Sequence, residues 1–394
     1  MKTTNILIRI SMCFFVFQVA AYSLYAQSEV NKTTKKESAG QHLQVSFLPF
    51  FGTRGSREVV NVDLSLNILS GIVNNVNNFE IGGLANIDRG NVRNVQLAGI
   101  QNVVAGSVYG FQVAGIGNIS RGLTGTQLAG ITNVVIGNAS GCQISGNVNI
   151  AKQFHGLQIA GIVNQAYNVN GIQIAGIANN SNHSSDVQIA GIVNNCKDTS
   201  NVQISGIVNK TSYNKGLQLS LINIADSASG IPIGLISIVK NGYHRVEVSA
   251  DEIFYTNVAF RTGISSFHNI VTIGIKPDNF SFPLWTIGYG VGSVFGNGKK
   301  LQYNFDILGQ HISHGDFHQS LSEIYKLYFG VDKHITNKIS VAVGATVNIY
   351  LVKNNVSDYS KGYSTIAPYT ITDNTFGTTN IKSWVGVKAS IRFL

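Results

Sequence analysis

Residues 156–179 read GLQIAGIVNQAYNVNGIQIAGIAN, in which a nine-residue motif returns after a connector of six residues. The motif occurs eight times between Asn94 and Asn209, with central glycines Gly99, Gly115, Gly130, Gly146, Gly161, Gly176, Gly191 and Gly206. These glycines are 15 or 16 residues apart. Self-similarity at a fixed short period indicates a repeat architecture. Looser copies around Gly83, at 216–224 and at 230–238 fit the degenerate ends of a capped array.

Side chains alternate within each motif, as they do along a β-strand. In the copy at 156–164, one face carries Leu157, Ile159, Gly161 and Val163, and the other carries Gln158, Ala160, Ile162 and Asn164. We therefore interpret each motif as one strand of about nine residues. The connectors repeat small or β-branched residues two positions after the motif: Val104, Ser120, Val135, Ala151, Ala166, Ser181, Cys196 and Thr211. These positions should face inward, as should Val108, Leu123, Ala139, Phe154 and Val169.

Equivalent connectors favour a parallel β-solenoid with one coil per repeat, because an antiparallel meander would alternate two kinds of turn. A meander whose repeats supply barrel strands is the alternative. In a solenoid the amides should stack as ladders at roughly 4.8 Å per coil and satisfy one another. The predicted ladder residues are Gln96, Gln112, Gln127, Gln143, Gln158, Gln173, Gln188, Gln203, Asn102, Asn118, Asn133, Asn149, Asn164, Asn179, Asn194 and Asn209. Their role is structural, with a ligand surface along the rod as the other interpretation.

The repeated unit G-h-Q-h-[AG]-G-h-h-N, where h is apolar, resembles bacterial surface-repeat proteins of the Bacteroidetes and spirochaete type. The resemblance covers roughly residues 43–240 and includes SFLPFFGT and SLNILSG, which look like the segment that precedes such repeats. Asn147 and Leu221 depart from the pattern. The resemblance implies an exported, envelope-associated protein, and it supplies no catalytic residues.

From about residue 241 the period stops and longer strict alternation begins. Eight candidate strands, with apolar residues on one face, predict an antiparallel barrel of the outer-membrane type, or alternatively a soluble sandwich. The opposite face carries charges that a barrel could pair internally: Glu247, Arg261, Asp306, Lys326, Asp332, Lys388 and Arg392. The candidates for an interfacial aromatic girdle are Trp285, Tyr289, Tyr325 and Trp384.

The start of the chain has the parts of a secretory signal, with Lys2 and Arg9 before an apolar run at 10–21. We expect cleavage after Ala26, or after Ser23, and no lipid anchor at Cys13. Residues 1–26 are then the signal, 27–42 a flexible mature N-terminus, 43–78 an initial β segment, 79–240 the repeat array and 241–394 the barrel-like domain.

The composition is typical of a turn-rich β protein, since only 12% of residues are charged and 42 glycines accompany 5 prolines. The formal charge of +9 falls to +7 once the two basic signal residues are removed. That excess suits phosphate-rich lipid headgroups or lipopolysaccharide as partners, or serves solubility alone. No motif indicates nucleic-acid binding.

Three possible sites carry no chemistry in this interpretation. The donors His311, His314, Asp316 and His318 should lie in a solvated loop without metal. Asp186 and Asp198 are the only acids between residues 91 and 225, and they do not align as the carboxylate pair that glycan cleavage requires. Cys142 and Cys196 should be three coils apart, too far for a disulfide, with Cys142 buried and Cys196 more accessible.

We therefore predict no catalytic residue, cofactor or metal, and a non-enzymatic structural or interaction protein of the outer membrane and cell surface. Its extracellular protein or glycan partner is unidentified. An outer-membrane pore or transport protein built partly from the repeats is the first alternative. A soluble secreted adhesin is the second.

Overall fold

The computed structural model describes residues 41–393 except 54–59, 277–283, 297–299, 315–321 and 354–365. The proposed signal and residues 27–40 of the proposed N-terminal segment lie outside the described residues, whereas Gln41 and His42 already belong to the first strand. The chain forms two compact units, residues 1–197 and 198–394. No helix in the described part of the chain has the length and hydropathy of a membrane span.

The first unit contains β1 (Gln41–Leu48), β2 (Phe51–Gly52), β3 (Val62–Asn67), β4 (Ser70–Val73), β5 (Val76–Gly82), β6 (Ala85–Asp88), β7 (Val92–Ala98), β8 (Gln101–Ala114), β9 (Gly117–Ala129), β10 (Thr132–Ser145), β11 (Val148–Ala160), β12 (Val163–Ala175), β13 (Ala178–Ser181), β14 (Ser185–Ala190) and β15 (Val193–Cys196). The second begins with β16 (Thr199–Ser205), β17 (Val208–Leu219), β18 (Ile222–Ala228), β19 (Ile231–Ile233) and β20 (Ile236–Val239).

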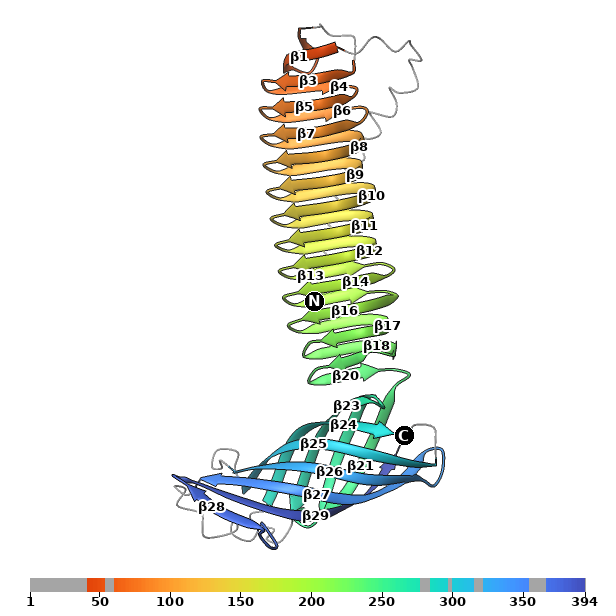
Figure 1. Cartoon of the computed structure of the whole chain (residues 1–394), viewed down its shortest axis with the longest axis vertical. Helices are drawn as coiled ribbons and strands as arrows, with labels where there is room; N and C mark the ends of the chain where they lie inside the picture. The colour runs from red at the N-terminus through yellow and green to blue at the C-terminus, as the bar shows by residue number, and fades with distance from the viewer. Residues whose placement is uncertain are drawn as a thin grey trace. The chain divides into compact units, whose positions relative to one another are not determined.

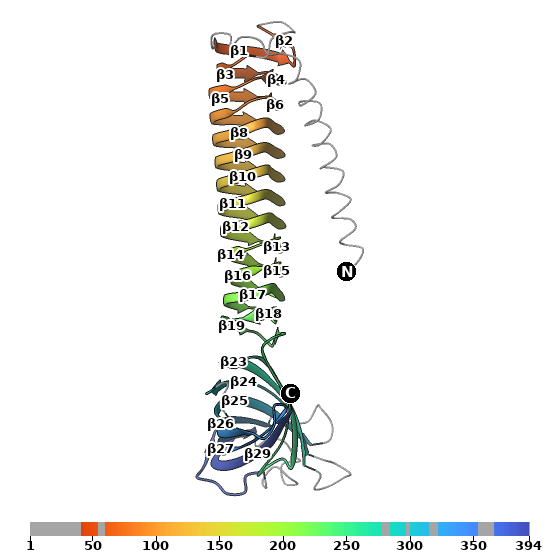
Figure 2. The ribbon, with the colours of Figure 1, turned by 90° about the vertical axis from the view of Figure 1, so that its right-hand side faces the viewer.

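The repeats stack as a parallel β-solenoid, one coil per repeat (Figures 1 and 2). Each motif residue pairs with its equivalent in the next coil, so that Gln143 lies opposite Gln158 and Asn149 opposite Asn164. The parallel register excludes the antiparallel meander. The predicted inward positions of the connectors are buried, and Val104, Val108, Leu123, Val135 and Phe154 belong to one continuous core.

The prediction of one strand per motif is wrong, because the coil turns in the middle of the motif. In the copy at 156–164, β11 ends at Ala160, the bend is Gly161–Ile162, and β12 begins at Val163. A Cβ on Gly161 would lie 2.1 Å from the carbonyl oxygen of Gly146, so only glycine allows the coils to stack at this corner. The strand then continues from the motif through the connector.

The second unit continues with β21 (Tyr243–Asp251), β22 (Thr256–Ile264), β23 (Phe267–Lys276), β24 (Leu284–Phe295), β25 (Leu301–His314), β26 (Ser322–His334), β27 (Ile339–Lys353), β28 (Thr372–Phe376) and β29 (Thr379–Phe393). Eight of these strands form a closed antiparallel barrel, because β29 pairs with both β27 and β21. The eight predicted strands are thus confirmed. The short β28, which pairs only with β29, was not predicted.

Within the second unit, the last solenoid coil meets the outer side of β22–β24 through polar contacts. Thr262 Oγ1 donates to the carbonyl of Ser237 at 2.8 Å, and Asn269 Nδ2 and the Tyr289 hydroxyl both donate to the carbonyl of Gly234 at 2.7 Å. A terminal coil has no following coil to bond its carbonyls, and an unpaired strand edge invites association. The barrel therefore caps two carbonyls at this end of the solenoid.

Candidate functional site

Two ladders of amides run through the solenoid interior. From Gln112 to Gln188, each ladder glutamine donates from Nε2 to Oε1 of the glutamine one coil earlier, as Gln143 does to Gln127 at 2.9 Å and Gln158 to Gln143 at 2.7 Å. From Asn102 to Asn179, each ladder asparagine instead donates to Oδ1 of the asparagine one coil later, as Asn149 does to Asn164 at 3.0 Å. The two rows of side-chain dipoles therefore point in opposite directions and offset each other.

The ladder amides are buried and use their hydrogen-bonding groups within the solenoid. Asn149 Nδ2 also donates to the carbonyls of Ile159 at 2.7 Å and Gln143 at 3.2 Å, so it ties the two ends of its coil together. Gln143, Gln158 and Asn149 are 0% exposed. A buried amide with its hydrogen bonds made has nothing left for a ligand. The ladder positions, which the sequence pattern picked out, are thus structural elements of the solenoid core.

The glutamine ladder ends at a buried pair of acids that the sequence analysis missed. Gln96 Nε2 donates to Glu80 Oε2 at 2.7 Å and also to Asp88 Oδ2. Glu80 occupies the glutamine position of its own coil and accepts from Asn67 Nδ2 at 2.9 Å. A carboxylate only accepts hydrogen bonds, so it can terminate a row of donors. The signal was available in FEIGGLAN, where Glu80 replaces the repeat glutamine.

Burial changes the acidity of this pair. Both carboxyls are nearly inaccessible, at 0% for Glu80 and 1% for Asp88. Desolvation raises the pKa of Glu80, and desolvation together with the neighbouring Glu80 charge raises the pKa of Asp88 well above its ordinary range. The two buried acids therefore form the end of the glutamine ladder inside the coil.

The barrel places apolar side chains on its outer wall. Along β27 the outward residues are Ile339, Val341, Val343, Ala345, Val347 and Ile349, and they alternate with inward residues such as Ala342 and Tyr350, which are fully buried. The outward side chains are well exposed, for example 54% for Val343, 58% for Phe329 and 62% for Val387. A wall of this kind is the reverse of the surface of a water-soluble barrel.

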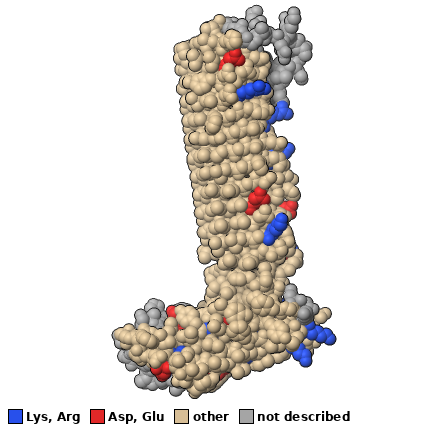
Figure 3. All heavy atoms as spheres, in the orientation of Figure 1, with Lys and Arg blue, Asp and Glu red and all other residues tan. Residues whose placement is uncertain are grey.

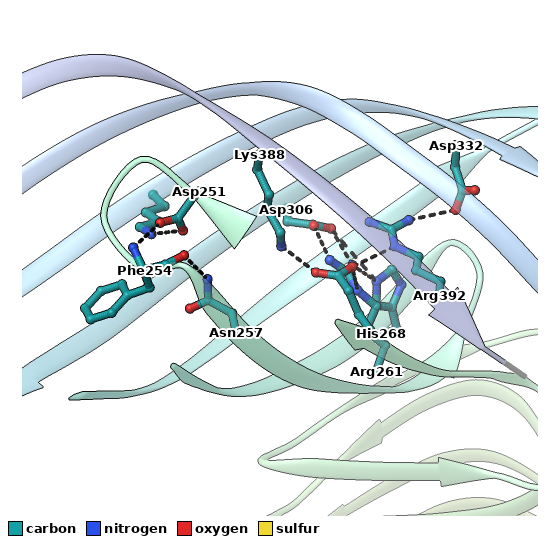
Figure 4. Close-up of polar contacts among 11 residues, drawn as sticks. Asp251, Phe254, Asn257, Arg261, His268, Asp306, Asp332, Lys388 and Arg392 are labelled. Atoms are coloured by element: carbon teal, nitrogen blue, oxygen red, sulfur yellow. Dashed lines mark hydrogen bonds and ion pairs between the residues drawn. The ribbon is translucent and has the colours of Figure 1, made fainter. Parts of the chain in front are cut away.

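The barrel interior holds the charges instead (Figure 4). Glu247 Oε2 accepts from Arg261 Nε at 2.9 Å and from Arg392 Nε at 2.6 Å, while Lys388 Nζ lies 2.5 Å from Glu247 Oε1. Arg261 also holds Asp306 through two parallel hydrogen bonds of 3.0 and 2.7 Å. The predicted internal pairing is confirmed, and the geometry is the bidentate one in which Arg and carboxylate interact most strongly.

This network is balanced in charge. Arg392 Nη1 donates to Asp332 Oδ2 at 2.8 Å, so Glu247, Asp306 and Asp332 face Arg261, Arg392 and Lys388. His268 Nε2 lies 3.1 Å from Arg261 Nη1. Because a guanidinium only donates, that ring nitrogen acts as the acceptor. Three acids opposite three bases leave no fixed net charge at the centre of the barrel.

A second cluster packs beside the network. Lys326 Nζ donates to Asp251 Oδ2 at 2.6 Å, and Trp384 Nε1 and Asn348 Nδ2 donate to Glu252 Oε1 at 2.9 and 2.8 Å. A cavity of about 20 Å³ lies beside Lys326 and Asp251 inside the barrel. That volume is on the order of one water molecule.

Several predicted positions are corrected by the structure. Trp384 is no girdle residue, because it points into the barrel and is only 1% exposed. His311 and His314 belong to strand β25 rather than to a loop, while Asp316 and His318 lie outside the described residues. Among the described residues, no group of three or more His, Cys, Asp or Glu side chains is arranged to hold a metal.

The two thiols are free, but their predicted accessibilities are reversed. Cys196 is 1% exposed and its Sγ donates to the carbonyl of His183 at 3.1 Å, whereas Cys142 is partly exposed. The inward face of each coil carries Gln and Ala, so the first apolar position of the motif, where Cys142 lies, faces outward.

Comparison of the chain with models of protein families, with curated proteins and with solved structures finds no match.

Proposed function

We propose that this chain is a non-enzymatic protein of the bacterial outer membrane, in which the barrel is the anchor and the solenoid is the displayed part. The observation that carries the proposal is the polarity of the barrel. Its outer wall is apolar and its interior holds paired charges, which is the arrangement of barrels that cross a membrane. A soluble sandwich or adhesin would leave that wall in water.

The sequence supports the same assignment from another direction. Residues 1–26 have the order of a secretory signal, and the repeat motif resembles bacterial surface-repeat proteins. Lipid tails would cover the wall, and headgroup phosphates or lipopolysaccharide would meet the basic excess of the chain. A conducting pore is the less suitable function, because Glu247, Arg261 and Asp306 fill the lumen at 0% exposure.

A charged substitution on the barrel wall tests the anchor. Val343→Arg should impair membrane assembly, since an arginine in the middle of a lipid-facing strand costs about 2–4 kcal/mol. Ile136→Arg is the matched control, because Ile136 is equally exposed, at 53% against 54% for Val343, but lies on the solenoid. The measurement is the fraction of each variant that detergent extracts from washed outer membranes.

The wild-type chain should be recovered in that detergent fraction, with Ile136→Arg at the same level and Val343→Arg strongly reduced. Recovery of intact wild-type protein in the culture supernatant would refute the anchor. In planar bilayers the purified protein should show no steady conductance, and a large constant conductance would favour the pore instead.

A further inference from the structure

A row of strained glycines bends five consecutive coils of the first unit. Gly110, Gly125, Gly141, Gly156 and Gly171 have φ of 136°, 140°, 123°, 127° and 140°. Side chains rarely adopt these angles, and a Cβ on Gly141 would lie 2.0 Å from the carbonyl oxygen of Gly125. The row ends at Asp186, where the next coil lacks the glycine. The strands also bulge just before this row, between Val135 and Asn138 for example.

A groove of about 660 Å³ runs along the same coils. Its floor is the buried row that contains Leu123, Ala139 and Phe154. Two columns of residues, polar except for one glycine, line it with one equivalent position per coil. The first column is Tyr109, Thr124, Ser140, His155 and Asn170, and the second is Ser107, Gly122, Asn138, Gln153 and Asn168.

The amides of the groove differ from those of the ladders. Asn138 and Asn170 are exposed and Gln153 is partly so. In the described part of the chain their side chains make no hydrogen bond to the protein, in contrast to the ladder amides beside them. Free amides and hydroxyls can each donate and accept, which suits a ligand that carries many hydroxyl groups.

We infer that this groove binds an extended oligosaccharide, with about one sugar residue for each coil. Coils about 4.8 Å apart present one position of each column at nearly the length of one pyranose residue in an extended chain. Tyr109, 46% exposed, gives an aromatic face on which a sugar ring can stack. Arg121 is the cation among the lining residues, and no acid lines the groove, so an acidic sugar fits better than a basic one.

A peptide is the poorer occupant. The backbone of the groove floor is already paired from coil to coil, as at Ala139 with Phe154, so no free strand edge is offered for a peptide to extend. Arg121 is the only lysine or arginine among the residues that line the groove, so the groove lacks the basic track of a nucleic-acid site. Figure 3 shows that charged side chains are also few on the solenoid face turned to the viewer.

Binding is tested on the full chain purified in detergent, with linear hexasaccharides of N-acetylglucosamine and of galacturonic acid as probes in calorimetry. The triple variant Asn138→Ala, Gln153→Ala, Asn170→Ala should weaken binding at least tenfold, as should Ser140→Trp, which fills the groove. Arg121→Gln should weaken binding of the acidic probe more than of the neutral one. The matched control is Gln165→Ala, which removes an outward amide of the same solenoid away from the groove.

The proposal extends the displayed role of the solenoid but does not need the membrane anchor, since binding is measured on purified protein. Absence of binding by both probes at millimolar concentration would overturn it, and so would wild-type affinity of the triple variant. Those outcomes would leave the membrane-fractionation result untouched, so the two proposals fail separately.

Discussion

The solenoid and the barrel both bury polar groups, but they do so in opposite ways. The solenoid uses neutral amides that bond to the same residue one coil away, 15 or 16 positions along the chain, as Gln158 does to Gln143. The barrel uses full charges whose partners lie far apart, as Arg392 and Glu247 do across 145 positions. Repetition can lengthen the first arrangement one coil at a time, whereas the second is complete only when the barrel closes.

The difference follows from what each group needs. An amide carries both a donor and an acceptor, so a row of identical amides satisfies itself and every coil can carry the same residue. A buried charge needs an opposite charge, so identical residues cannot serve each other and the strands must differ. This is why the solenoid is periodic in sequence and the barrel is not. The predictions below test that contrast, beginning with the largest expected effect.

Removing the central acid of the barrel should have the largest effect. Glu247→Gln leaves Arg261, Arg392 and Lys388 without their shared carboxylate in a site of 0% exposure, which should cost about 3–5 kcal/mol of unfolding free energy. Denaturant unfolding of the purified protein in detergent measures it. Lys382→Gln is the control, because Lys382 pairs with the exposed Asp373 at 3.6 Å and should cost under about 1 kcal/mol. Equal losses for the two variants would contradict the central role of Glu247.

The glycine row should tolerate no side chain. Gly141→Ala places a Cβ against the carbonyl oxygen of Gly125 at a φ of 123°, which should cost at least about 2 kcal/mol. Gly117→Ala is the matched control in the same array. Its Cβ would meet Thr132 at 3.3 Å, and other coils carry side chains at this position. Thermal unfolding should separate the two variants clearly, and similar midpoints would mean that the backbone is not strained at Gly141.

Neighbouring ladder positions should be strongly coupled. Gln143→Leu leaves the acceptor of Gln127 and the donor of Gln158 unpaired, at a cost of about 1–3 kcal/mol. Adding Gln158→Leu moves one broken end to Gln173 and creates no new one, so the second change should cost little more.

A double-mutant cycle measures this coupling, with an expected value of about 1–2 kcal/mol. The control pair is Gln112→Leu with Gln173→Leu. These two positions are not ladder neighbours, so their losses should add. Additive losses for the adjacent pair would show that the ladder acts as separate hydrogen bonds and not as a connected row.

The period, the parallel stacking and the inward connector positions could be predicted because they repeat in the sequence. A residue that repeats at this period, such as Gln158, indicates that its equivalents in the neighbouring coils stack on it. The corner at Gly161 could not, since alternation continues in sequence where the backbone turns. That turn decides which face of the motif is inside, and so Cys142 was assigned to the wrong face. Cys196 lies in the inward connector column, and its burial agrees with that column rather than with the greater accessibility predicted for it. The eight barrel strands were visible through alternation, whereas Trp384 was misplaced because its hydrogen bond to Glu252 spans 132 positions.

The acid pair was missed for a related reason. Asp88 belongs to a column of small or β-branched residues, and only the stacked coils bring it to Gln96 and Glu80. The pair is the one place in the described solenoid of the first unit where the interior resembles that of the barrel, with buried carboxyls, but no cation is among the causes of its shifted pKa values. A change at this pair therefore has the smallest expected effect among these predictions, and it tests how the solenoid buries carboxyls without a cation.

The first coils should be less stable at neutral pH than at acidic pH. The pKa of Asp88 is raised by burial and by Glu80, so the folded state holds a proton that the unfolded chain releases above pH 4. The stabilisation is complete below that pH and is lost as pH rises through the folded pKa, at no more than about 1.4 kcal/mol per pH unit for one proton.

Asp88→Asn should flatten this dependence and raise stability at pH 8, because the amide keeps an acceptor for Gln96 and can donate to Glu80. Limited proteolysis of the first coils, compared at pH 5 and pH 8, measures the difference. Asp63→Asn is the control of opposite sign, since hydrogen bonds from Asn77 and His42 lower the pKa of Asp63 and its contribution is lost as pH falls. If Asp88→Asn and the wild type were cleaved with the same pH dependence, the pair would not hold the proton. The first coils would then bury a charge without an opposite charge beside it, whereas the buried charges of the barrel network are paired.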